Sequence, residues 1–363
     1  MRHETATDLA RLMQCEGSHL VERLPIVSEM DQTVRDEGNA WHWLAQQLFN
    51  GALSRDNAVG QQAYNGVFIT SSMLAHAVDY IDALTIGEME QQTTFGDGQT
   101  WQVDGRADHI SYDTRSGLLH VDDGKYGYGL VEPEWNWTLI AHAVGWTIRN
   151  QVRPVKVCLS IYQPRAYHPL GVHRTWTFDG AMLTEMFQRI ERVMVSPEQT
   201  LRTGSLCRKC PGRFVCPAWR EASMNAIEAT SHAYSDSLEP DDLAREMDLL
   251  DHAAKVIVDR KKAIDELALY KVSSGVVIPG RALDRPKGNR RYRKNVTPDM
   301  LLALTGRDVA ERKLPTPSKL EDLGIGKMVI DAITERPDGA PRLVRVDADA
   351  LARKHFGATN NAD

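Results

Sequence analysis

The sequence predicts an α/β protein in which a mixed central sheet is flanked by helices and followed by a mainly helical C-terminal region. Helical spacing of apolar residues dominates before residue 90, and strand-like runs replace it from 90 to 125. Helices and strands then alternate up to residue 197. This α-β-β-β-α-β order favours a mixed sheet covered by helices.

The individual elements are predicted from apolar periodicity and from turn-forming residues. In the second helix, Trp41, Leu44 and Leu48 recur at helical spacing, and Gly51 follows as a stop. The turn DTRSG separates the second and third strands of the central run. The predicted helices cover residues 6–14, 36–50, 72–86, 134–150 and 179–197, and the predicted strands cover 91–95, 105–113, 118–125, 155–164 and 173–179.

A change of pattern near residue 230 predicts two domains, residues 1–230 and residues 231–363. The second begins with a long helix whose apolar residues step by threes and fours, apart from one gap at Lys261: Leu243, Met247, Leu250, Ala254, Ile257, Ile264 and Leu267. A basic segment follows, with Asp284 opposed by seven cations: Arg281, Arg285, Lys287, Arg290, Arg291, Arg293 and Lys294. It predicts a phosphate-binding stripe, with a solvated loop as the alternative.

The bulk composition limits the class of protein. A chain of 363 residues with a net charge of −6 can bury one large core or two modest ones, and its overall charge does not indicate a nucleic-acid binder. The N-terminus lacks the apolar region of a signal peptide, and no stretch approaches the length of a membrane span. Five cysteines, an odd number, argue against a disulfide scaffold, so we expect a protein of the reducing cytosol.

Four of the cysteines are divided between two distant segments. Cys15 stands near the N-terminus, and Cys207, Cys210 and Cys216 form a C-x-x-C-x5-C motif. Four thiolates suit a zinc ion or an iron–sulfur cluster, with ordinary thiols as the alternative. A shared ligand set would close residues 15–207 into a ring, so we expect one domain between them. Cys158 lies in an apolar strand and is predicted to be a small core residue.

Two aspartates and a lysine are predicted to meet at the end of the central hairpin. In the strand LLHVDDGK, Asp123 and Lys125 share one face with Leu119 and Val121. If the hairpin is symmetric about residues 115 and 116, Asp108 lies opposite Asp123. Because like charges opposed on a sheet repel, the pair predicts a Mg²⁺ or Mn²⁺ site, with a solvated hairpin end as the alternative.

Two helices offer further candidates for this site. His42 lies one helical turn after Gly38, a glycine that we expect to let its helix approach another backbone closely. Thr138 and His142 are four residues apart, so they share a helix face and either approach the site or pack under it. Lys125 could orient an attacking water or stabilise charge that develops on a phosphate.

These motifs resemble the PD-(D/E)xK nuclease superfamily, and within it the RecB-like exonuclease branch that carries an iron–sulfur cluster. The resemblance rests on G-x-x-x-H at Gly38–His42, G-x-x-D at Gly105–Asp108, D-x-K at Asp123–Lys125, and one cysteine before and three after this core. The stretch N-x-x-L-x-x-x-A-x-G at Asn136–Gly145, G-x-N-R at 288–291 and the segment 336–344 are similar to phage- and prophage-borne nucleases. The similarity covers nearly the whole chain.

The resemblance implies a restriction-endonuclease-like core and Mg²⁺- or Mn²⁺-dependent cleavage of DNA, by a phage-derived exonuclease in the cytoplasm of a bacterial host. It implies a 4Fe–4S cluster on Cys15, Cys207, Cys210 and Cys216. His42, Asp108 and Asp123 would bind the metal, Lys125 would assist catalysis, and His142 would stand where the family often has Tyr. Arg290, Arg291, Arg293 and Lys294 are expected to contact the DNA backbone.

The implied role is DNA processing in phage recombination or replication, with a phage single-strand-binding or annealing protein as a candidate partner. Two rival functions are a non-catalytic DNA-binding accessory protein and an iron–sulfur redox sensor. Retention of Asp108, Asp123 and Lys125 disfavours the first, because binding alone needs neither repulsive carboxylate. The absence of a flavin or nucleotide motif disfavours the second. Strand polarity, strand preference, the choice between exonuclease and endonuclease action, and the oligomeric state are left open by the sequence.

Overall fold

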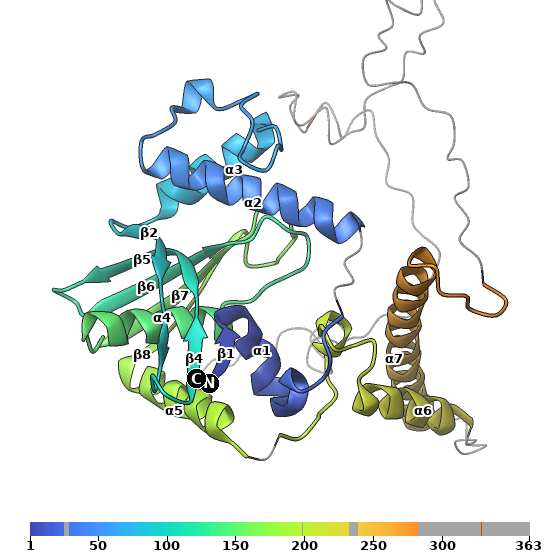
Figure 1. Cartoon of the computed structure of the whole chain (residues 1–363). Helices are drawn as coiled ribbons and strands as arrows, with labels where there is room; N and C mark the ends of the chain where they lie inside the picture. The colour runs from blue at the N-terminus through green and yellow to red at the C-terminus, as the bar shows by residue number, and fades with distance from the viewer. Residues whose placement is uncertain (25–28, 198, 232–238, 282–327, 329–363) are drawn as a thin grey trace, which may run out of the picture. The chain divides into compact units, whose positions relative to one another are not determined.

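The computed structural model describes residues 1–24, 29–197, 199–231, 239–281 and 328 (Figure 1). Residues Met1–Asp284 form one compact unit and Arg285–Asp363 form a second. All helices and strands below belong to the first unit. The predicted domain boundary near residue 230 stays a prediction. Among the described residues, no helix is long and apolar enough to cross a membrane.

A five-stranded mixed sheet forms the centre of the first unit, as the sequence predicted. Its order is β2 (Glu88–Gln92), β5 (Arg106–Asp113), β6 (Leu118–Gly124), β7 (Lys156–Tyr162) and β8 (His173–Asp179). β6 and β7 pair in parallel, and the other neighbours pair antiparallel. Parallel neighbours need a crossover, which α4 (Trp137–Asn150) supplies between β6 and β7. α4 begins at Trp137 because the Asn136 side chain caps the N–H groups of Thr138 and Leu139.

A second sheet was missed by the sequence analysis. It has three short strands in the order β1 (Arg2–Thr5), β4 (Trp101–Asp104) and β3 (Phe95–Gly96). Strands this short contain too few residues to establish a period of two. The predicted strand 91–95 is wrong for a related reason. At Thr93 the N–H bonds to Gly105 O at 2.9 Å and the hydroxyl bonds to His142, so the chain leaves one sheet before it joins the other.

Helices cover the central sheet on both faces (Figure 1). On one face α1 (Ala6–Gln14), α4 and α5 (Gly180–Val195) contact one another and bury the main apolar cluster against Val121, Leu159 and their neighbours. On the other face α2 (Glu29–Phe49) and α3 (Ser71–Ala83) form a second cluster around Trp41, with Tyr126 and Tyr162. The sheet is therefore buried on both sides, which explains the apolar run in β7.

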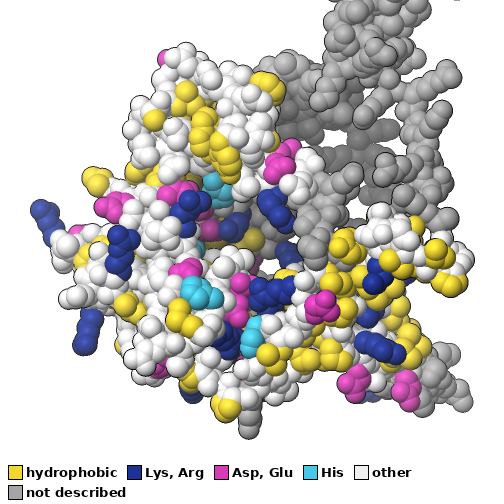
Figure 2. Space-filling model, in the orientation of Figure 1, with side chains coloured by type: hydrophobic (Ala, Val, Ile, Leu, Met, Phe, Trp, Pro, Cys, Tyr) yellow, Lys and Arg dark blue, Asp and Glu magenta, His cyan; other side chains and the backbone are white. Residues whose placement is uncertain are grey.

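α6 (Pro217–Ser231) and α7 (Pro240–Ser273) pack on each other and on the cysteine segment. α7 was expected from the spacing of its apolar residues, whereas α6 was not. Their small core is built from Phe214, Trp219 and Ala263. Figure 2 shows hydrophobic side chains gathered over these two helices. The exposed large apolar residues of α6 and α7 include Met224, Ile227, Leu243, Met247 and Leu250.

Two helical glycines have opposite surroundings, and one corrects an expectation. A Cβ at Gly145 in α4 would lie 2.2 Å from the carbonyl oxygen of Thr93. A Cβ at Gly38 in α2 would meet no described atom within 4 Å. Gly38 therefore does not serve a close backbone approach, and the sequence-based expectation for it was wrong.

We predict that Gly145→Ala destabilises the protein by about 1–3 kcal/mol, because the added methyl group forces α4 away from Thr93. The matched change Gly38→Ala should be neutral or stabilising by about 0.5–1 kcal/mol, since alanine favours a helix and meets no obstacle. Urea unfolding of both variants measures the difference. Equal stability of the two variants would contradict the packing argument.

Candidate functional site

The β5–β6 hairpin has the register that the sequence predicted. Its Cα partners run from Asp113 opposite Leu118 to His109 opposite Asp122, as in a hairpin symmetric about residues 115 and 116. Asp108 and Asp123 are the next two residues along this register. The N–H of Gly124 donates to Asp108 Oδ2 at 2.9 Å, so the Asp108 side chain terminates the ladder.

Asp123 is buried and its carboxylate is only partly satisfied. The Nζ of Lys125 lies 2.7 Å from either carboxylate oxygen and directs its hydrogen bond to Oδ1. Among the described residues, this ammonium is the one group that contacts Oδ2, and no other donor reaches that atom. Oδ2 therefore keeps lone-pair capacity that a cation or a water could use.

His42 reaches Asp108 from α2. Its Nδ1 lies 3.4 Å from Asp108 Oδ2, and the two side chains are 27% and 15% exposed. The structure thus brings together His42, Asp108, Asp123 and Lys125, which the sequence analysis had selected from three separate segments. They lie where α2 meets the ends of β5 and β6.

The electrostatics of the site follow from burial and from like charges. Burial raises the pKa of Asp108, the nearby His42 opposes this, and the Asp123 carboxylate raises the pKa further. Burial lowers the pKa of Lys125. The negative charges of Asp123 and Asp108 raise it by more, and the pKa of Lys125 therefore lies above its usual value. The lysine is therefore held charged between two carboxylates.

Glu90 is a third carboxylate at this site, and the sequence analysis did not select it. In β2, Met89 lies opposite His109 and Gln91 opposite Ala107, so the register places Glu90 opposite Asp108. Glu90 has a φ of 57°, an unusual value for a strand residue. Burial and then Asp108 raise its pKa, while Arg106 Nε at 2.6 Å opposes the shift. A strand predicted from residue 88 instead of 91 would have revealed it.

His142 lies under the site as a neutral side chain. Its Nδ1 is 2.8 Å from Thr93 Oγ1, and burial lowers its pKa to about 4, against the opposing effect of Asp123. A Cβ at Gly105 would lie 2.8 Å from His142 Cε1, which explains the glycine of the G-x-x-D motif. Thr138 contributes its N–H to the Asn136 cap.

The four predicted cysteines line one small cavity, together with Arg11, Arg213 and Trp219. The backbone N–H of Arg202 donates to Cys15 Sγ, and that of Gly204 donates to Cys207 Sγ, both at 3.3 Å. Burial raises the pKa values of Cys207 and Cys210, and the other cysteines add to the shift. Cys158 lies apart in β7 and is 6% exposed, as expected of a core residue.

The described part of the chain contains no preformed group of three or more His, Cys, Asp or Glu side chains that could hold a metal ion. This applies both to the carboxylate site and to the cysteine cavity. The basic residues Arg290, Arg291, Arg293 and Lys294, and the motifs at 288–291 and 336–344, lie outside the described residues. Their predicted contact with DNA stays a prediction.

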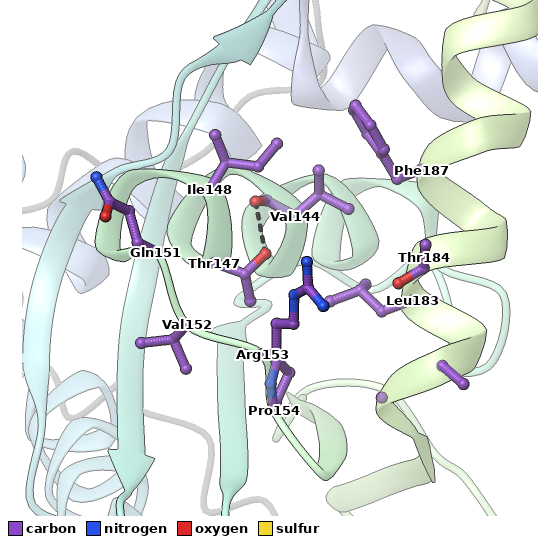
Figure 3. A pocket seen from close by; sticks show the side chains of 12 residues that line it. Val144, Thr147, Ile148, Gln151, Val152, Arg153, Pro154, Leu183, Thr184 and Phe187 are labelled. Atoms are coloured by element: carbon purple, nitrogen blue, oxygen red, sulfur yellow. Dashed lines mark hydrogen bonds between the residues drawn. The ribbon is translucent and has the colours of Figure 1, made fainter.

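A larger cavity, of about 690 Å³, lies between α4 and α5 (Figure 3). Its walls include Val144, Leu183 and Phe187, and the side chain of Arg153 extends between the two helices. It is lined by none of the predicted site residues. We therefore do not assign the catalytic centre to this cavity, although it is larger than the cysteine cavity.

A family model described as "Protein of unknown function (DUF2800)" matches residues 6–350. The chain belongs to this family. No curated protein matches it. The matched range includes every predicted site residue, from Cys15 to Lys294. The family therefore extends over the carboxylate site, the cysteines and the basic segment, and its description assigns no activity to them.

We predict that His142 makes the protein less stable in acid. Its pKa is about 4 when folded and about 6.5 when exposed, so the unfolded chain binds the proton more readily between these values. Stability is fully present above pH 6.5 and falls by up to about 3 kcal/mol as the pH drops to 4.

Unfolding free energies of the wild type and His142→Gln across this pH range test the effect. The glutamine cannot titrate, so its profile should be flatter than that of the wild type. His252→Gln, at an exposed histidine in α7, is the control and should keep the wild-type profile. Parallel profiles for the wild type and His142→Gln would contradict the prediction.

Proposed function

We propose that this protein is a Mg²⁺- or Mn²⁺-dependent deoxyribonuclease, an exonuclease of phage or prophage origin that acts in the cytoplasm of a bacterial cell. One observation carries the proposal: Asp108 and Asp123 stand next to each other across the hairpin, beside a charged Lys125 that is the one described group in contact with Asp123 Oδ2. This arrangement has no evident value for folding, since like charges in proximity destabilise a sheet. It suits a site where a cation binds and a phosphate is held.

The residues fit a hydrated divalent cation. Mg²⁺ keeps several waters and is commonly bound through one or two carboxylates plus substrate phosphates, so a preformed group of three protein ligands is not required. Asp108 and Asp123 would hold the ion, with His42 as an additional ligand and Glu90 as a nearby carboxylate. When bound, the ion would neutralise charge on the phosphate during in-line displacement.

The chain's own groups then have defined roles. The Lys125 ammonium, held at Asp123, would orient the attacking water or stabilise charge that develops on the phosphate. Neutral His142 presses on Gly105 and Thr93 at the start of β5, so it positions the strand that carries Asp108. The role in phage DNA recombination or replication, and a single-strand-binding or annealing partner, belong to the same proposal.

Asp108→Asn, Asp123→Asn and Lys125→Ala should each abolish cleavage while the fold persists, because each removes a group that contacts the cation or the phosphate. The measurement is degradation of end-labelled DNA with Mn²⁺, which also gives the polarity. Glu88→Gln is a matched control, an exposed carboxylate in β2 that should retain full activity. Full activity in either aspartate variant would refute the metal site, and a wild type that binds DNA without cutting it would favour a non-catalytic accessory protein.

We propose in addition that Cys15, Cys207, Cys210 and Cys216 hold a structural 4Fe–4S cluster. The four side chains share a cavity, and two of their sulfurs accept backbone N–H bonds of the kind that tune such clusters. In a cubane each thiolate binds a different iron, so the ligands need not converge on one point.

Anaerobically purified protein should be brown and contain about four irons per chain. Cys207→Ser should lose iron and lower the melting temperature, because it removes a ligand that joins residues 207–216 to Cys15. Cys158→Ser is the matched control, a buried cysteine outside the cavity, and should keep its iron. Stoichiometric zinc without iron would overturn the assignment of the metal.

A further inference from the structure

A separate cavity of about 380 Å³ opens beside the loop that follows Lys125. Its volume is at the low end of the range for small-molecule sites. It is formed by four parts of the chain: α2, the beginning of α3, the loop after β6 and the loop after β7. The side chains that matter are Glu37, Ser72, Met73, Tyr126, Tyr128 and Arg165.

The cavity is fixed to the candidate catalytic residues by an aromatic stack. Tyr126 directly follows Lys125, and its ring stacks on Trp41 with 5.3 Å between centroids and 11° between planes. Trp41 in turn meets the His42 ring edge-on at 5.3 Å. A group bound in this cavity would therefore lie next to the loop and the helix that carry Lys125 and His42.

Arg165 joins the two tyrosines. Its guanidinium lies 4.7 Å from the ring centre of Tyr126 and 4.0 Å from that of Tyr128. Tyr126 is 6% exposed, whereas Tyr128 is 63% exposed. Tyr128 is thus a ring held on one side by a cation and left open elsewhere. Stacked aromatic and guanidinium groups of this kind bind unpaired nucleic-acid bases.

The charges in the cavity favour a base over a phosphate. Arg165 Nη1 lies 2.7 Å from Glu37 Oε2, so the lining cation is already matched by an anion. A phosphate would meet the Glu37 carboxylate and be repelled. A base is neutral, stacks on a ring or on the Met73 thioether, and offers edge groups to the Ser72 hydroxyl and to Glu37.

We infer that this cavity binds one unpaired DNA base beside the cleavage site, so that the substrate is single-stranded DNA or a single-stranded end. The inference rests on the proposed nuclease function, because it assigns the strand that approaches Lys125. A duplex keeps its bases stacked and paired, and cannot insert one without paying for unstacking. The preference for single-stranded over double-stranded DNA then depends on the stacking of an unpaired base on Tyr128.

The test is DNA binding by the full chain in EDTA, measured by fluorescence anisotropy. The probes are a labelled oligothymidylate, a blunt duplex and an abasic strand of the same length. Tyr128→Ala should weaken binding of the oligothymidylate by about 5- to 150-fold, the range for loss of one stacked base. Its affinity for the duplex and for the abasic strand should not change. Tyr128→Phe loses the hydroxyl that accepts from Arg165 Nη2 but keeps the ring, so it should bind the oligothymidylate far more tightly than Tyr128→Ala.

Tyr167→Ala is the matched control, a tyrosine 90% exposed and outside the cavity, and should leave all three affinities unchanged. Unchanged oligothymidylate affinity in Tyr128→Ala would overturn the inference, as would an equal loss for the abasic strand. Because EDTA removes the divalent cation that cleavage needs, the binding result does not depend on cleavage. A wild type that does not cleave DNA with Mn²⁺ would contradict the proposed function alone. Unchanged oligothymidylate affinity in Tyr128→Ala would contradict this inference alone.

Discussion

The register of the β5–β6 hairpin is the constraint on which the rest of the structure depends. A shift by one residue would turn Leu119 and Val121 out of the main core and send Asp123 to the opposite face. Leu119 and Val121 are both fully buried against the helices of that face. The cost of exposing them holds Asp108 and Asp123 together despite their repulsion. Apolar packing thus maintains an unfavourable charge arrangement. Such a trade of stability for a strained arrangement of side chains is common at functional sites.

Packing on the second face positions the remaining groups. A Cβ at Gly124 would lie 2.4 Å from the Trp41 ring, so the glycine between Asp123 and Lys125 makes room for the indole. Trp41 is completely buried and stacks on Tyr126, while the next residue, His42, faces Asp108. One aromatic residue therefore fixes the histidine on one side and the loop after Lys125 on the other. This connection explains why the cavity at Tyr128 and the carboxylates belong to one region.

The two ends of the segment between Cys15 and Cys207 meet through contacts that need no metal. Gly17 N–H bonds to Thr200 O at 3.1 Å, and a Cβ at Gly17 would lie 2.4 Å from Gln199 O. Arg2 reaches the carbonyl oxygens of Val193 and Met194 at the end of α5. Backbone hydrogen bonds thus bring Cys15 close to the segment of Cys207 before any cofactor is considered. A cluster would reinforce this closure, and its thiolates would become a second tie between the two segments.

The sequence by itself determined the order of the central elements, the hairpin register and the convergence of four cysteines. Hairpin register is local: the turn at 113–117 and the alternation of Leu119, Val121 and Asp123 specify it without reference to the rest of the chain. Tertiary structure alone decided which distant groups meet. Glu90 reaches Asp108 only through the edge pairing of β2, and the short strands β1, β4 and β3 are stabilised by pairing with one another. The cavity at Tyr128 likewise joins four segments whose contacts have no periodicity in sequence. Local patterns encode the direction in which a side chain points, whereas its neighbour across space is selected by the packing of whole elements.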